Sequence, residues 1–69
     1  MLNQNEQKRV LKAISSRVYD LQPSQKTPSD LHRELHGDIK IRWGVTSYRN
    51  LSSVNMIRIL NFINSWIPK

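Results

Sequence analysis

The residues of this 69-residue chain best suited to chemistry are cations without acidic neighbours. The formal net charge is +6, and residues 39–69 contain five Lys or Arg and no Asp or Glu. Residues 1–38 hold the other six bases and all five acids. Concentrated positive charge favours a polyanionic partner, of which nucleic acid is the first candidate. The competing explanation is that the charge serves solubility alone.

Two groups in the basic half are candidates for contact with nucleic acid. The first flanks a predicted turn and consists of Lys40, Arg42, Tyr48 and Arg49. Cations there would neutralise phosphates and release condensed counterions. Lys40 and Arg42 equally suit the negative end of a helix, and Tyr48 equally suits packing.

The second group is a polar stripe at helical spacing formed by Asn55, Arg58 and Asn61, continued by Asn64 and Ser65. Asn bonds adenine edges and Arg bonds guanine, so a stripe without acids suits a helix in the major groove of duplex DNA. The competing interpretation is a solvated helix face. A phosphate contact by Arg58 is the simplest functional role in this stripe.

Four aromatic residues, Tyr19, Trp43, Phe62 and Trp66, have two interpretations. They could stack on bases of single-stranded nucleic acid, or they could form the core of so small a chain. We expect Phe62 and Tyr19 in the core, and leave Trp66 open because it lies near the C-terminus.

Catalytic and metal-binding patterns are weak. His32 and His36 share a helix face, but Glu34 between them does not form the His-Glu-x-x-His arrangement, and no further ligand is apparent. The chain has no cysteine, no glycine-rich phosphate loop and no nucleophile with an evident base. We therefore expect no enzyme activity, metal, cofactor or small-molecule substrate.

The apolar periodicity predicts one all-α domain, a small three-helix bundle with a short ordered turn between helices two and three. The first helix is expected over 6–21, after a frayed or linker start at residues 1–5. The second begins at the cap Thr27 with Pro28 and ends at Gly44, and Gly37 inside it marks close packing or a boundary. The third runs from a cap at Ser52 or Ser53 to Trp66. Polar residues interrupt its apolar run, so we expect no membrane span.

Three segments carry a family resemblance: SRVYDL at 16–21, DIKIRWGVTSYRNL at 38–51 and LNFINSWIP at 60–68. They resemble the C-terminal domain of phage antirepressor-type regulators, the ORF-six-C class. The resemblance implies a phage or prophage origin, the cytoplasm of a bacterial host, and a role in regulating DNA transactions. Such domains usually follow a separate N-terminal domain, so the chain would be a fragment or a stand-alone protein.

Two functions follow as hypotheses. The first is a DNA-binding or DNA-associated accessory domain that contacts phosphates, foremost of double-stranded DNA, through the basic C-terminal half. The second is a protein-interaction or dimerisation module, with a homodimer or a repressor as partner. It would expose an apolar face on the third helix made of Met56, Ile59, Phe62, Trp66 and Ile67.

Overall fold

The computed structural model describes residues 2–68. This part of the chain contains three α-helices, α1 (Gln4–Asp20), α2 (Pro28–Trp43) and α3 (Met56–Ser65). Two single-turn 3-10 helices, η1 (Tyr48–Asn50) and η2 (Ser53–Asn55), lie between α2 and α3. No strand occurs within residues 2–68, so the predicted all-α three-helix bundle is confirmed.

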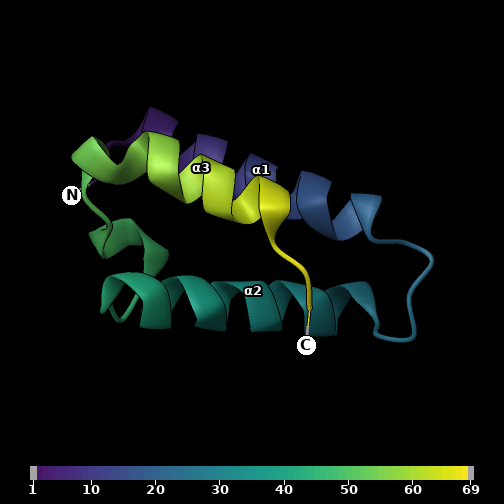
Figure 1. Ribbon diagram of the computed structural model, residues 1–69. Coiled ribbons are helices and arrows are strands. Elements are labelled where there is room, and N and C mark those ends of the chain that lie inside the picture. Colours follow the sequence, from purple (N-terminus) through teal and green to yellow (C-terminus); the bar gives the residue numbers. More distant parts are fainter. Residues whose placement is uncertain (1, 69) are drawn as a thin grey trace.

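The helices form two layers (Figure 1). α1 and α3 run side by side in the same direction, and α2 runs beneath them in the opposite direction. α1 packs closely against both other helices, whereas α2 and α3 approach each other less closely. The C-terminal end of α2 and the N-terminal end of α3 lie at the same end of the bundle.

The core takes three residues from each helix, at the spacing that amphipathic helices require. It contains Val10, Ile14 and Val18 of α1, Leu31, Leu35 and Ile39 of α2, and Met56, Ile59 and Ile63 of α3, together with Leu2, Leu51 and Trp66. The expectation that Tyr19 belongs to the core is wrong, because its side chain is 80% exposed. Tyr19 directly follows the buried Val18, and the helical turn directs it outward.

The N-terminal segment is ordered from residue 2. The side chain of Asn3 accepts a hydrogen bond from the backbone N–H of Glu6, and the Glu6 carboxylate accepts one from the N–H of Asn3. This capping box starts α1 at Gln4, and Leu2 is buried against the core. The predicted frayed start is therefore wrong for residues 2–5, and Met1 lies outside the described residues.

The predicted ends of α2 are confirmed. The Thr27 side chain accepts a hydrogen bond from the N–H of Asp30, and Gly44 ends the helix in the left-handed region with φ 65°. α2 continues through Gly37, and a Cβ built there meets nothing within 4 Å. Gly37 thus marks neither a close approach nor a helix boundary.

α3 begins later than expected, after the turn η2. The side chain of Ser52 makes no capping hydrogen bond. The hydroxyl of Ser53 instead donates to the Glu6 carboxylate over 2.7 Å, which ties the approach to α3 to the start of α1. Leu51, between η1 and η2, is buried, so the connection is ordered as predicted.

The segment after α3 is held by two polar contacts of Trp66. Its indole Nε1 donates to Asp38 Oδ2 over 2.7 Å, and its carbonyl accepts from Arg17 Nε over 2.8 Å. The ring is 5% exposed, so Trp66, which the sequence left open, belongs to the core. These contacts fix the C-terminal segment to α1 and α2.

Candidate nucleic-acid interface

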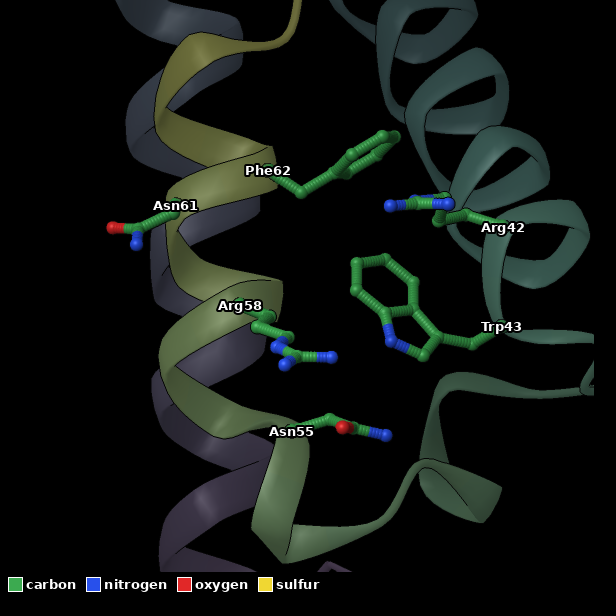
Figure 2. A pocket seen from close by; sticks show the side chains of 6 residues that line it. All are labelled: Arg42, Trp43, Asn55, Arg58, Asn61 and Phe62. Carbon is green, nitrogen blue, oxygen red and sulfur yellow. The ribbon is translucent and has the colours of Figure 1, made fainter.

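A groove of about 420 Å³ opens between the C-terminal end of α2 and α3. It is lined by Arg42 and Trp43 of α2, by Asn55 at the end of η2, and by Arg58, Asn61 and Phe62 of α3 (Figure 2). Four of these residues, Arg42, Asn55, Arg58 and Asn61, are among the seven predicted nucleic-acid contacts. The fold thus brings residues of both predicted groups to one place.

The two arginines reach the groove from different helices. Figure 2 shows Arg42 extending from α2 and Arg58 from α3, both toward the space occupied by Trp43. Both residues are exposed, and neither pairs with a carboxylate within residues 2–68. The Arg42 guanidinium lies 5.8 Å from the centroid of the Trp43 ring. Two unpaired cations facing one hollow attract an anion there.

An aromatic pair also lines the groove. The rings of Trp43 and Phe62 meet edge to face, with centroids 5.3 Å apart and planes at 85°. Both side chains are half-buried and pack against the core. Phe62 was expected in the core and Trp43 was not assigned, so their position in the groove was missed. The available signal was spacing, since Arg58 and Phe62 stand four apart and share a helix face.

The two asparagines differ in how they face the groove. Asn55 is half-buried at the N-cap of α3, its side chain makes no capping hydrogen bond, and it extends across the groove below Trp43 (Figure 2). Asn61 is exposed and lines the rim, with its amide turned away from Trp43 (Figure 2). Asn55 is therefore the better placed of the two to bond a ligand in the groove.

Four of the five acidic residues, Glu6, Asp30, Glu34 and Asp38, interact with groups outside the groove. Glu6 takes part in the α1 capping box and accepts from Ser53, which holds the pKa of its carboxyl below the usual range. Asp38 stands one helical turn before Arg42 but accepts from the indole of Trp66. Glu34 pairs with Lys26, and Asp30 lies 4.0 Å from Arg33. No carboxylate lines the groove, so its positive charge is not compensated locally.

The remaining predicted contacts, Lys40, Tyr48 and Arg49, do not line this groove. Tyr48 packs edge-on against His36 of α2 at 5.8 Å, and the Arg49 guanidinium lies 5.9 Å from the Tyr48 ring. Burial, with the positive charges of His32 and Lys40, lowers the pKa of His36 below its usual value. The predicted cationic contacts are therefore divided, with Arg42 and Arg58 at the groove and Lys40 and Arg49 outside it.

The prediction of an exposed apolar face for a protein partner is wrong for most of its residues. Met56, Ile59 and Trp66 lie in the core, and Phe62 is half-buried against Trp43. Of the five predicted residues only Ile67 is exposed, at 71%. Met56, Ile59 and Ile63 of α3 pack within the chain, whereas Ile57 of the same helix is exposed.

A second hollow, of about 310 Å³, is lined by Lys26, Asp30, Arg33 and Glu34. Its cations and carboxylates compensate one another, so it lacks the one-sided charge of the groove. Within residues 2–68, no group of three or more His, Asp or Glu side chains is arranged to hold a metal ion. No helix in that range has the length and apolar character to cross a membrane.

Comparison with known proteins identified no relatives of this chain. No protein-family model matched it, and no curated protein or solved structure showed significant similarity to it.

Proposed function

We propose that this chain binds nucleic acid, including double-stranded DNA, through phosphate contacts at the groove between α2 and α3. The observation that carries the proposal is that Arg42 and Arg58, from separate helices, face one groove that no carboxylate lines. Phosphates brought near them would release counterions and gain charge-assisted hydrogen bonds. Arg49 of η1 and Lys40 of α2 would add weaker contacts outside the groove.

The position of Arg58 supports a role in binding rather than in folding. It stands in the first turn of α3, where the positive end of the helix dipole disfavours a cation. It also has no carboxylate partner within residues 2–68 to offset that cost. A cation at a position unfavourable to the fold is accounted for by an anionic ligand.

The resemblance of residues 16–21, 38–51 and 60–68 to the ORF-six-C class supports a more specific role. Under this proposal the chain is an accessory domain of a phage or prophage regulator, acting on DNA in the cytoplasm of a bacterial host. The groove would then help to hold the regulator on DNA by contacts to the phosphate backbone. Base recognition in the major groove by Asn61 is not required for this role.

The test is titration of a labelled DNA duplex with the protein at low and at moderate salt. The parent should bind at low salt and lose affinity steeply as salt rises. Arg42→Gln and Arg58→Gln should each weaken binding, and should reduce the slope of log affinity against log salt by about 0.9 for each phosphate that is no longer neutralised. Arg9→Gln, an exposed cation of α1 away from the groove, is the matched control.

Three results would contradict the proposal. They are no binding at low salt, binding that does not change with salt, and equal losses of affinity from Arg9→Gln and Arg58→Gln. The last would mean that net charge, and not the groove, is responsible for the attraction.

A further inference from the structure

The groove combines features that a phosphate-binding surface does not need. Besides Arg42 and Arg58, it contains the indole of Trp43, which Figure 2 shows spread across the middle of the groove with the face of the ring toward the viewer. Contacts to phosphates require cations alone, whereas an aromatic face accepts a base by stacking. Arg58 reaches toward the ring from α3, and the Arg42 guanidinium lies over the ring, 5.8 Å from its centroid, so phosphates of a bound nucleotide would lie near both cations.

Asn55 adds an unused amide beside the same ring. Asn is among the preferred N-cap residues because its side chain bonds the first helical amides, yet Asn55 makes no such bond. Its side chain extends across the groove below Trp43 instead (Figure 2). An amide carries both a donor and an acceptor, so it can bond the edge of a base that stacks on the indole.

A base within a duplex cannot stack on Trp43. Bases of a duplex are stacked on their neighbours, so an indole cannot reach their faces unless the base is unstacked. A hollow of about 420 Å³ is large enough to take a single nucleotide. A duplex would contact the rim through its phosphates and leave Trp43 unused.

We propose that the groove takes one unpaired base of single-stranded DNA, stacked on Trp43 and bonded by Asn55, with adjacent phosphates held by Arg42 and Arg58. This inference rests on the proposed function, whose phosphate contacts it keeps, and adds that single-stranded DNA is bound more tightly than a duplex because it offers an unpaired base. An acidic peptide would satisfy the arginines but not the indole face, which is why a nucleotide is the better occupant.

The experiment measures the affinity of the parent protein for four labelled probes at one low salt concentration. The probes are a single-stranded thymidine decamer, an abasic decamer with the same phosphates, a duplex decamer and a decamer of glutamate. Stacking of one base predicts that the thymidine decamer binds about 5- to 150-fold more tightly than the abasic decamer. It should also bind more tightly than the duplex and the peptide.

A pair of substitutions tests the assignment of the ring. Trp43→Leu should remove the preference for thymidine over the abasic decamer, whereas Tyr19→Leu, at an exposed aromatic residue of α1, should leave it unchanged. Because Trp43 packs on Phe62, folding of each variant is checked by circular dichroism. If Trp43→Leu does not fold, Trp43→Phe keeps a smaller ring and should show an intermediate preference.

The outcomes separate the two proposals. Equal binding of the thymidine and abasic decamers, or tighter binding of the duplex or the peptide than of thymidine, would overturn the single-base inference. Binding to the duplex and the abasic decamer would in that case still support phosphate contact. No binding to any DNA probe would overturn both proposals.

Discussion

The opposite placement of Arg58 and Arg42 on their helices predicts opposite effects on stability. Arg58 stands in the first turn of α3 and Arg42 in the last turn of α2. Replacement by Gln removes the charge and keeps a similar helix propensity. Arg58→Gln should therefore stabilise the fold and Arg42→Gln should destabilise it, while both weaken binding to DNA.

The expected magnitudes follow from the surroundings of each side chain. An exposed charge in a terminal turn interacts with the helix dipole by about 0.3–1 kcal/mol, so Arg58→Gln should raise the free energy of unfolding by about 0.5 kcal/mol. Arg42→Gln removes a similar stabilisation and also the interaction with the Trp43 ring, which adds about 0.5 kcal/mol or more. For a domain of this size these changes correspond to Tm shifts of about +3 °C and about −6 °C.

The assay is thermal unfolding followed by far-ultraviolet circular dichroism at low and high ionic strength. Both shifts should shrink as salt rises, because salt screens the interaction of an exposed charge with the dipole. Arg9→Gln, in the middle of α1, should change the free energy of unfolding by less than about 0.5 kcal/mol. A loss of stability from Arg58→Gln would refute the reasoning, since Arg58 would then contribute to the fold.

Three further predictions concern the scaffold. Gly37→Ala should raise the free energy of unfolding by about 1 kcal/mol, because a methyl group there meets no other atom. Gly44→Ala should lower it by about 1 kcal/mol, because φ 65° is unfavourable for alanine. Chemical denaturation measures both changes. The lowered pKa of His36 means that the unfolded chain binds its proton more readily. Stability should therefore be full above about pH 6.5 and fall as the pH drops below that value, and His36→Gln should flatten this part of the profile. Trp66→Phe removes the donor to Asp38 and should lower the free energy of unfolding, measured by the same denaturation, by about 2 kcal/mol.

The helices could be predicted because their signals are local. The spacing of Val10, Ile14 and Val18, the cap at Thr27 and the stop at Gly44 all act within a few residues, and each is present in the structure. The start of α3 was misplaced because Ser53 bonds Glu6, which is 47 positions away in the sequence. A serine that suits a cap gives no local sign of such a distant partner.

The site could be predicted in part. Charge and residue type indicated Arg42, Asn55 and Arg58, but not that residues from the end of α2 and the start of α3 share one groove. That juxtaposition depends on how the helices pack. The same limit explains why the apolar residues of α3 were expected on the surface, since their periodicity indicates a buried face without saying which element covers it.

Both extremities of the chain contribute to the interior, since Leu2 and Trp66 are 3% and 5% exposed. A truncation that removes Leu2 or Trp66 would open a cavity and release a segment that closes the bundle. Tags or fluorophores for the binding assays therefore belong outside positions 2–66, joined through a flexible spacer. Attached there, a label leaves the interior intact.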